Sequence, residues 1–357
     1  MRCIFRLLQL IGVVTNLLSL WLVGLIFPGV IVSCILAAVW PGAASIMVGV
    51  VGFGIRILLR FVALLAEFPL AAIYTKSIFV VIWICLGYGM ILLFLLAKKK
   101  RASGLVCACV IELCLALLLS WMVPRSCNVH MTVLDVGQGQ CVILTAKGRT
   151  FVIDCGGDYD EDVADMAAET LLSQGIYRID GLILTHFDRD HAGGAAYFLS
   201  RIRADKVFMP PGNENEALAD LEYAYFVQSD VQMQWQGCVM QIFAPVLANS
   251  DNESGISVLF SGENCDILIT GDMSTLGEAL LLSGKQLPKL EALVVGHHGS
   301  KNSTSDKLLE ATMPEVAMIS VGENSYGHPT DEVLRRLEKC GCQVRRTDIE
   351  GTIVFRR

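Results

Sequence analysis

Four side chains of the types that bind metal ions lie within six residues of the chain: His186, Asp188, Asp190 and His191. They directly follow the apolar run 181–184, which predicts a short buried strand that ends at this loop. His186 and Asp188 are two positions apart and can converge from one turn, whereas the neighbouring Asp190 and His191 tend to point to different sides. Because imidazole and carboxylate groups bind divalent ions, the spacing predicts a loop that holds two such ions.

Gly193 and Gly194 come after these candidate ligands, where they allow the backbone to pass close to the ions before a helix begins. The alternative interpretation is a polar loop whose acids cap the next helix and whose histidines lie at the surface. Two His and two Asp at this spacing are hard to explain in that way. We therefore interpret the loop as a metal site.

Other apolar runs that predict strands also end in polar clusters. The runs 151–153 and 267–270 precede Asp154 and Asp272, and a third run precedes the sequence Gly-His-His-Gly-Ser at 296–300. Strand ends that meet at one edge of a layered fold are where such proteins build sites. We therefore expect these clusters to join the histidine and aspartate loop.

Strand and helix patterns alternate from residue 129 to the end of the sequence, which predicts an α/β domain with mixed sheets. Three strands are expected between 129 and 154, a helix near 161–174, and further strands near 181–185, 206–209, 239–244, 256–260, 265–270, 291–295, 316–320 and 352–355.

The order of these clusters resembles the metallo-β-lactamase fold, an αβ/βα sandwich, and the details resemble the ComEC-type DNA-uptake (competence) family. In that family the usual H-x-H-x-D-H pattern has Asp in place of the second His, as Asp188 does here. The segments 135–139 and 326–329 also match, so the likeness covers nearly all of residues 129–357. Two departures are Gln140, where the family commonly has an acid, and the lack of any His between residues 191 and 297.

The resemblance implies a site with two divalent metal ions. His186 and Asp188 would bind one ion, Asp190, His191 and His297 the other, and Asp272 would bridge them. We accordingly expect Asp190 and Asp272 to act in catalysis. Because Asp188 replaces a softer His ligand, Mn²⁺ becomes as suitable as Zn²⁺.

Further residues are expected to support the site. Asp154 would fix the loop that carries His186, with a turn or helix-capping acid as the alternative, and His298 would be a hydrogen-bonded neighbour rather than a ligand. His328 would protonate a leaving oxygen or contact phosphate, unless it is a structural turn residue. Lys301, next to Ser300 at an expected helix start, would bind phosphate, unless it is simply solvated.

The charges divide the chain into two parts. Residues 1–127 contain ten Lys and Arg against two acids, a net charge of +8, and residues 128–357 contain 18 Lys and Arg against 33 acids, a net charge of −15. The first part has the hydropathy of a helical membrane region, and the second has the mixed polarity and length of one domain with a sizeable core. We therefore expect a membrane region at 1–127 and a hydrolase domain at 128–357.

Apolar stretches close to the ~20 residues of a spanning helix predict four spans, at 8–27, 29–51, 77–97 and 104–123. The stretch 54–68 differs, because Arg56, Arg60 and Glu67 recur in it at helical spacing, which is typical of a helix lying in the membrane interface. A fifth, tilted span is the alternative.

The basic run Lys-Lys-Lys-Arg at 98–101 favours a cytoplasmic position for the loop between the last two spans. The hydrolase domain would then lie on the outer side of the cell membrane. Counting back through four spans places the N-terminus outside with Arg2 and Arg6, which weighs against this topology. We nevertheless expect a multi-pass membrane protein in contact with lipid and an extracytoplasmic hydrolase domain.

We expect a membrane-anchored hydrolase, a phosphodiesterase or nuclease that cleaves single-stranded DNA during competence-type uptake. The resemblance carries the DNA assignment, because a domain with a net charge of −15 repels a polyanion at long range. One alternative is a tethered metallo-hydrolase of another ester. Another is a degenerate, non-catalytic accessory subunit of a DNA-uptake channel. Gln140 and the missing third His support this alternative.

The membrane part resembles only the last spans of the family's channel domain. Polar side chains in the expected spans are too few to line a pore: Glu112, Asn16, Ser19, Ser33, Ser45 and Ser77. We expect that the chain alone hydrolyses but does not translocate DNA, and that it pairs with a separate chain supplying the earlier spans or is a remnant.

Overall fold

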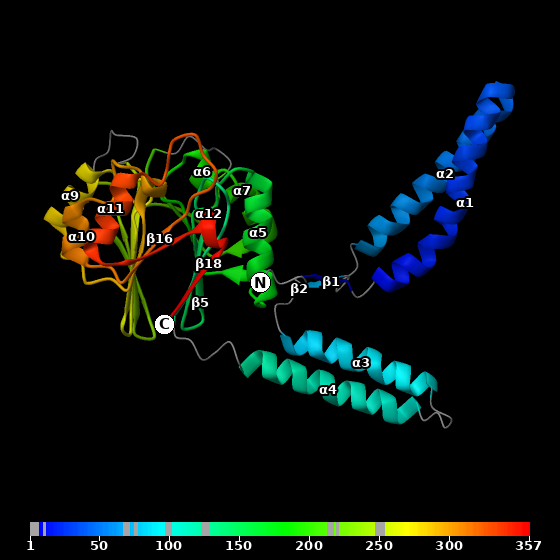
Figure 1. Cartoon of the computed structure of the whole chain (residues 1–357), viewed down its shortest axis with the longest axis horizontal. Helices are drawn as coiled ribbons and strands as arrows, with labels where there is room; N and C mark the ends of the chain where they lie inside the picture. Colours follow the sequence, from blue (N-terminus) through cyan, green and yellow to red (C-terminus); the bar gives the residue numbers. More distant parts are fainter. Residues whose placement is uncertain are drawn as a thin grey trace. The chain divides into compact units, whose positions relative to one another are not determined.

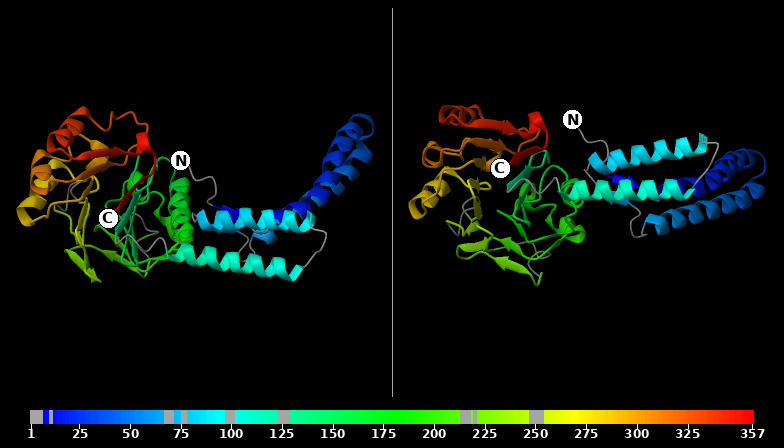
Figure 2. Two further views of the ribbon diagram at one scale, coloured as in Figure 1. Left: turned by 60° about the horizontal axis from the view of Figure 1, so that its bottom comes forward. Right: turned by 90° about the horizontal axis from the view of Figure 1, so that it is seen from below.

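The structure is a computed structural model of the 357-residue chain. It describes residues 7–9, 12–66, 72–74, 78–96, 102–122, 129–212, 218, 221–246 and 254–357. The residues from 129 onward form a sandwich of two sheets with helices on its outer faces (Figures 1 and 2). The predicted α/β sandwich is therefore confirmed.

Seven strands form the first sheet in the order β10-β9-β7-β5-β4-β3-β18. Their bounds are β3 Val129–Val133, β4 Val142–Ala146, β5 Arg149–Ile153, β7 Gly181–Ile183, β9 Val207–Met209, β10 Ala224–Phe226 and β18 Ile353–Arg356. Strands β5, β7, β9 and β10 are parallel, whereas β18, β3, β4 and β5 pair antiparallel. The parallel pair β5 and β7 brings the loops after Ile153 and Ile183 to the same edge of the sheet.

The second sheet has the order β11-β12-β13-β14-β15-β16-β17. Its strands are β11 Val231–Trp235, β12 Cys238–Phe243, β13 Ser257–Gly262, β14 Cys265–Ile269, β15 Ala292–Val294, β16 Val316–Ile319 and β17 Gln343–Arg346. The first four pair antiparallel and β14 to β17 are parallel. The loops after β14, β15 and β16 therefore also leave from one edge.

Helices cover the outer face of each sheet (Figure 1). Helices α5 Asp160–Ser173 and α7 Ala195–Arg201 flank the first sheet, and α9 Thr275–Gly284, α10 Asp306–Thr312 and α11 Asp331–Cys340 cover the second. Shorter elements are α6 Arg189–Ala192, α12 Thr347–Glu350, the 3₁₀ helix η2 Gly296–Gly299 and the paired strands β6 Arg178–Ile179 and β8 Arg203–Ala204. In α11, Val333 and Leu337 lie four positions apart and are both buried, as expected of an amphipathic helix.

Two apolar cores hold these layers together. Between the sheets, the ring of Trp235 packs against Phe151 and Phe260 at centroid distances of 5.5 and 6.0 Å, and its Nε1 donates to the carbonyl oxygen of Ala146 at 3.0 Å. A second core fills the space between the second sheet and its helices and includes Leu268, Leu293, Leu308 and Leu337. Burial on both faces makes the sheets rigid supports for the loops at their ends.

The predicted strands and helix lie close to the observed ones, but five described strands after residue 128 have no counterpart in the prediction: β6, β8, β10, β11 and β17. Each of them is the outermost strand of a sheet or pairs at its edge. Their residues are largely exposed or half-buried, so they lack the continuous apolar run by which the inner strands are recognised.

The N-terminal helices begin and end at other residues than predicted. Helix α1 spans Gly12–Val39 with Pro28 inside it, and α2 spans Pro41–Ala66. The predicted break at residues 28–29 is therefore wrong: the chain turns before Pro41, which occupies the first turn of α2, where a missing N–H costs little. The predicted interfacial helix at 54–68 is likewise the continuation of α2 rather than a separate helix; Glu67 and residue 68 lie outside the described residues.

Among the described residues, two helical segments are long and apolar enough to cross a membrane, Ser19–Val39 and Pro41–Leu65. Shorter apolar segments, Ile82–Leu96 and Ser103–Leu119, lie within α3 Ile78–Leu96 and α4 Ala102–Met122. Four spans and their direction across the membrane therefore stay a prediction. The basic run 98–101, on which that direction depends, lies outside the described residues.

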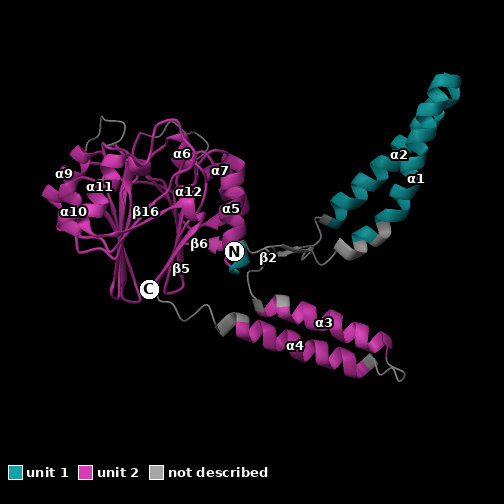
Figure 3. Cartoon of the chain, viewed as in Figure 1, with its two compact units in different colours: residues 1–77, 172–175 teal, residues 78–171, 176–357 magenta. Residues whose placement is uncertain are grey.

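The chain divides into two compact units, which Figure 3 distinguishes by colour. One contains Met1–Ser77 and Leu172–Gly175, and within it β1 Leu7–Gln9 pairs with β2 Ala72–Tyr74. The other contains Ile78–Leu171 and Ile176–Arg357. Charge and hydropathy predict a boundary between residues 127 and 128, which falls inside the second unit. The membrane region at 1–127 and the hydrolase domain at 128–357 therefore stay a prediction.

Candidate metal centre

Asp154 follows β5 directly and is completely buried. Its carboxylate accepts hydrogen bonds from the backbone N–H of Thr185 at 2.6 Å, from the Thr185 hydroxyl at 2.8 Å and from Nε2 of Gln140 at 2.7 Å. Nδ1 of His191 lies 2.8 Å from the same carboxylate and must donate to it, because a carboxylate only accepts. Asp154 thus holds both ends of the histidine and aspartate loop, as the sequence predicts for a supporting residue.

The backbone of this loop packs against neighbouring glycines. The carbonyl of Asp190 accepts from the N–H of Gln140 at 2.9 Å, and that of His191 accepts from the N–H of Cys155 at 2.7 Å. A Cβ atom on Gly156 would lie 2.4 Å from the carbonyl carbon of Asp190 and the nitrogen of His191, so only glycine fits there. Close backbone packing therefore fixes where the side chains of Asp190 and His191 begin.

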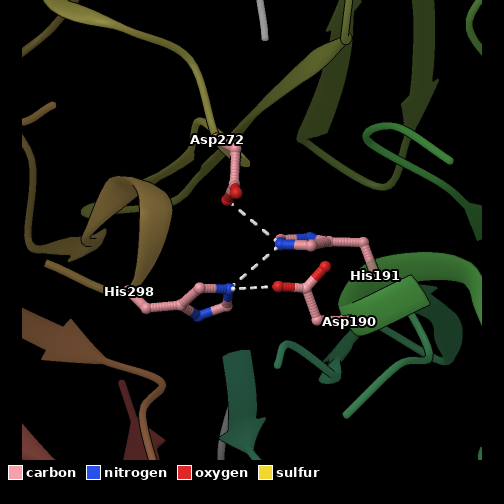
Figure 4. A group of neighbouring side chains, drawn as sticks. All are labelled: Asp190, His191, Asp272 and His298. Carbon is pink, nitrogen blue, oxygen red and sulfur yellow. Dashed lines mark hydrogen bonds and ion pairs between the residues drawn. The ribbon is translucent and has the colours of Figure 1, made fainter. Parts of the chain in front are cut away.

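The structure brings five of the six predicted ligands together, with His298, in two groups. One consists of Asp190, His191, Asp272 and His298, drawn in Figure 4, and the other of His186, Asp188 and Asp190. Within each group, one ligand atom from every residue lies within 4.8 Å of the others. Asp190 belongs to both groups, and both sets of side chains arise from loops at the same edge of the sandwich.

Three histidines turn the same ring nitrogen toward these groups. Nδ1 of His191 donates to Asp154, and Nδ1 of His298 donates to the carbonyl oxygen of Ser320 at 2.8 Å. Nδ1 of His186 lies 3.0 Å from the Thr185 hydroxyl, which already donates to Asp154 and so accepts from His186. In all three rings Nε2 is therefore the nitrogen left to face the site, the arrangement typical of metal-binding histidines.

The distances in the site fit bound ions better than hydrogen bonds. Nε2 of His186 is buried without a hydrogen-bond partner among the described residues and lies 3.7 Å from Oδ2 of both Asp188 and Asp272. Nε2 of His298 lies 3.4 Å from Oδ2 of Asp190. Two ligand atoms that each lie about 2.1 Å from one ion are about 3.0–3.5 Å apart at octahedral to tetrahedral angles and slightly farther apart at wider angles, so an ion can occupy these gaps. The donor set suits Zn²⁺ or Mn²⁺.

Asp272 lies between the two histidines of the loop. Its Oδ1 is 3.0 Å from Nε2 of His191, and its Oδ2 is 3.7 Å from Nε2 of His186. Bridging of two ions by Asp272, which the resemblance implies, stays a prediction. Asp188, by contrast, is largely exposed and reaches the site only beside His186.

His297 and His298 are placed differently from the prediction, which made His297 a ligand and His298 its neighbour. Both residues have positive φ, 49° and 51°, and the tight η2 turn directs them differently. His298 is buried within the group of four, whereas His297 is 31% exposed, with Nε2 3.6 Å from Oδ2 of Asp272. The structure thus places His298 rather than His297 in the group of four, and His297 borders the site.

Electrostatics follow from burial and from the carboxylates. Burial lowers the pKa of His186, and the charge of His191 adds to this effect. For His191, burial also acts downward, but the carboxylates of Asp272 and Asp154 outweigh it and raise the pKa well above its usual value. Burial would raise the pKa of Asp272, but the neighbouring histidines, His191 first, lower it far below the usual range.

The predicted substrate-binding residues lie at the margin of the site. Ser300 is buried, and its hydroxyl accepts from the N–H of Asn302 at 3.3 Å within the turn. Lys301 is exposed, and it does not begin a helix as predicted, because α10 begins at Asp306. The His328 ring meets the His297 ring edge-on, with centroids 5.7 Å apart, and its Nδ1 is buried without a partner among the described residues.

Comparison with known protein families shows which families the chain matches. Residues 134–323 match the metallo-beta-lactamase superfamily, and residues 1–101 match the competence protein family. The chain is 31% identical to Recombination protein 2 of Haemophilus influenzae, with 72% of this chain and 32% of that protein covered. It is 30% identical to ComE operon protein 3 of Bacillus subtilis, with 74% of this chain and 38% of that protein covered. The chain thus spans about a third of the length of these relatives.

Among solved structures, the metallo-beta-lactamase fold protein YhfI from Bacillus subtilis is similar over 64% of this chain and 100% of its own, with 10% identity and a TM-score of 0.45. The family match covers more than half of the chain and includes every residue of the two ligand groups. The chain belongs to the metallo-β-lactamase superfamily, and it joins this domain to a competence-protein segment, the combination of the ComEC-type family.

Proposed function

We propose that the chain is a membrane-anchored two-metal phosphodiesterase, a nuclease that cleaves single-stranded DNA during competence-type uptake. The observation that carries this proposal is the convergence of three histidine Nε2 atoms with the carboxylates of Asp190 and Asp272. Two divalent ions at such a site lower the pKa of a shared water and stabilise both the attacking and the leaving oxygen of a phosphoryl displacement. The names of the relatives, a recombination protein and a ComE operon protein, support DNA as the substrate.

The chain's own residues orient the reaction. Asp190 and Asp272 lie between the histidines of the two groups, where they would hold the ions, and the ions would supply the positive charge that holds the reacting phosphate. His328 borders His297 at the outer side, and burial lowers the pKa of its ring. A neutral ring at neutral pH suits a hydrogen bond to a phosphate oxygen better than proton donation to a leaving group. Ser300 and Lys301 would contribute at the margin of the phosphate site.

The competence-family match and the apolar helices support association with a membrane. We place the hydrolase domain on its outer side, because the basic run 98–101 favours a cytoplasmic loop. A separate chain that supplies further channel spans would be the partner for DNA transport. In this arrangement the present chain processes DNA at the membrane and does not conduct it alone.

One observation favours a different substrate. Residues 128–357 carry a net charge of −15, which repels a small, less anionic ester less strongly than a DNA strand. A tethered hydrolase of another ester is therefore the second candidate. A non-catalytic accessory subunit is the third candidate. The presence of Gln140 where the family commonly has an acid is weak support for it, because the Gln140 amide donates a hydrogen bond to Asp154 and so takes part in the site.

DNA cleavage by the full chain, purified in detergent with Mn²⁺ or Zn²⁺, tests the proposal. We expect cleavage of a labelled single-stranded oligonucleotide, and a loss of more than about 100-fold for Asp190→Ala, because a ligand matters at least as much as the residues that support ligands. Glu338→Ala, an exposed acid far along α11, is the control and should keep full activity. Equal rates for Asp190→Ala and the wild type, or hydrolysis of small esters without cleavage of DNA, would contradict a nuclease.

A further inference from the structure

Three aromatic rings lead from the metal centre to the surface of the domain. Nε2 of His297 lies 3.6 Å from Oδ2 of Asp272, so the first ring borders the ligand groups. The ring of His328 meets His297 edge-on at 5.7 Å and 83°, and the ring of Tyr326 lies nearly parallel to that of His328, at 5.9 Å and 29°. The rings therefore form a continuous path outward from the site.

One side chain fixes the turn that carries the two outer rings. Oδ1 of Asn324 accepts from the backbone N–H of Tyr326 at 3.1 Å and from that of His328 at 3.0 Å. Its Nδ2 donates to the carbonyl oxygens of His328 at 2.8 Å and of Gly322 at 2.9 Å. Asn324 thus fixes the backbone of the turn from which both outer rings project.

Tyr326 is 74% exposed although one side of its ring rests on His328. Single exposed aromatic side chains are common on protein surfaces, and Tyr177, at 70% exposed, is another in this domain. What distinguishes Tyr326 is its position: its ring is supported on one face, open on the other, and connected through two histidine rings to the metal ligands. A flat, pre-oriented ring beside a hydrolytic site is a binding surface for another flat ring.

We propose that Tyr326 is the base-binding residue of this site, on which an unpaired nucleobase next to the scissile phosphodiester stacks. The proposal rests on the proposed function and names the class of substrate, single-stranded nucleic acid. Stacking is suited to a domain with a net charge of −15, because it does not depend on attraction of the phosphate backbone at long range. It also selects against duplex DNA, whose bases are already stacked and paired.

Kinetics of the full chain in detergent with Mn²⁺ test this role. Removing one base–aromatic contact weakens binding by about tenfold, so Tyr326→Ala should raise KM for a single-stranded oligonucleotide by about tenfold and change kcat much less. Tyr326→Phe keeps the ring and should behave as the wild type, and so should the control Tyr177→Ala. A metal content equal to the wild type's in Tyr326→Ala would show that the ligand groups are intact.

Oligonucleotides with a single abasic position separate stacking from a structural role of the turn. In the wild type, loss of one base beside the cleaved bond should raise KM about tenfold, and Tyr326→Ala should not respond to the same change. An identical response to the abasic position in both proteins would overturn the proposal. So would a fall in kcat with KM unchanged, since this would mean that Tyr326 supports the site rather than the base.

A failure of the proposed function is distinguishable from a failure of this inference. If the wild-type chain cleaves no DNA, fluorescence anisotropy of a labelled thymidine oligonucleotide still measures binding. Weaker binding by Tyr326→Ala of about tenfold, with equal binding of a fully abasic strand by both proteins, would uphold base stacking without nuclease activity. Equal affinities of the two proteins for the thymidine strand would overturn it.

Discussion

At the scale of single residues, Asp154 connects the folding of the domain to the chemistry of its site. One buried carboxylate accepts from Thr185 twice, from Gln140 and from His191. These contacts orient His191 directly and His186 through the Thr185 hydroxyl. The carboxylate therefore determines which nitrogen of each ring faces the ions.

Replacing Asp154 tests that role. Asp154→Asn keeps the volume but substitutes an NH₂ group for an oxygen that faces several donors. We expect metal affinity to fall by about 10- to 100-fold, the usual effect of removing a residue that orients a metal ligand. Competition titration with a chromogenic chelator measures the affinity, and far-UV circular dichroism checks the fold. A folded variant that binds metal as tightly as the wild type would show that Asp154 is only a turn residue.

Metal binding should release protons. The carboxylates of Asp272 and Asp154 raise the pKa of His191 above its usual value of about 6.5 despite its burial, so the metal-free chain carries this ring protonated at about pH 7. An ion must displace that proton, whereas His186, whose pKa burial lowers, is already neutral. Metal affinity should therefore increase as pH rises toward the raised pKa of His191.

The same shift affects the metal-free fold in the opposite direction. Because the folded pKa of His191 is raised, its contribution to stability is fully present below about pH 6.5 and is lost as pH rises through the folded value.

The release of protons on metal binding can be measured directly. Calorimetric titration with Mn²⁺ in two buffers of different ionisation enthalpy counts the protons released. No release at about pH 7 would contradict a protonated His191.

The sequence allows most members of the two candidate ligand groups to be predicted, because His186, Asp188, Asp190, His191 and Asp272 follow apolar strand runs. It does not allow a choice between His297 and His298. The two are adjacent, and their positive φ angles in a tight turn decide which ring enters the group of four. Aromatic stacking of Tyr326 on His328 has no sequence signal either, since it depends on how Asn324 folds the turn.

At the scale of elements, the segment after β5 packs closely against the backbone of the loop that carries Asp190 and His191. Gly156→Ala should destabilise the domain strongly, because the new Cβ would lie 2.4 Å from two backbone atoms of that loop. We expect a loss of about 2–4 kcal/mol of unfolding free energy, as for other overpacked or strained core positions, together with weaker metal binding.

Gly284→Ala is the matched control for this change. Gly284 is the last residue of α9 and is exposed, and a Cβ atom added to it would have no heavy atom within 4 Å. An added methyl group there should leave stability unchanged or raise it by up to about 1 kcal/mol. Denaturant unfolding of both variants compares them. Equal stability of Gly156→Ala and the wild type would mean that the loop does not depend on close backbone packing.

Elements with long apolar or amphipathic patterns are predicted well, and those at edges are not. The inner strands and α5 lie within a few residues of their predictions, whereas β11 and β17, half-exposed at sheet edges, have no apolar run. In the apolar N-terminal helices, uniform hydropathy hides the true break. Pro28 lies inside α1, and Pro41 begins α2.

At the scale of the whole chain, the sequence separates a basic, apolar part from an acidic domain, and the domain alone contains both ligand groups. Residues 1–101 match the competence protein family, but the chemistry of the proposed function depends on how many ions the domain holds. Two ions are suited to phosphoryl transfer, whereas one ion would suit a structural role. The number of ions therefore separates the nuclease from an accessory subunit.

Metal content of the full chain, purified in detergent and dialysed against metal-free buffer after loading with Mn²⁺ or Zn²⁺, measures this number directly. Mass spectrometry of the elements should give about two ions per chain for the wild type and for Glu338→Ala, and fewer for Asp190→Ala, since Asp190 belongs to both ligand groups. One ion or none in the wild type, or a content that Asp190→Ala leaves unchanged, would contradict the two-metal centre.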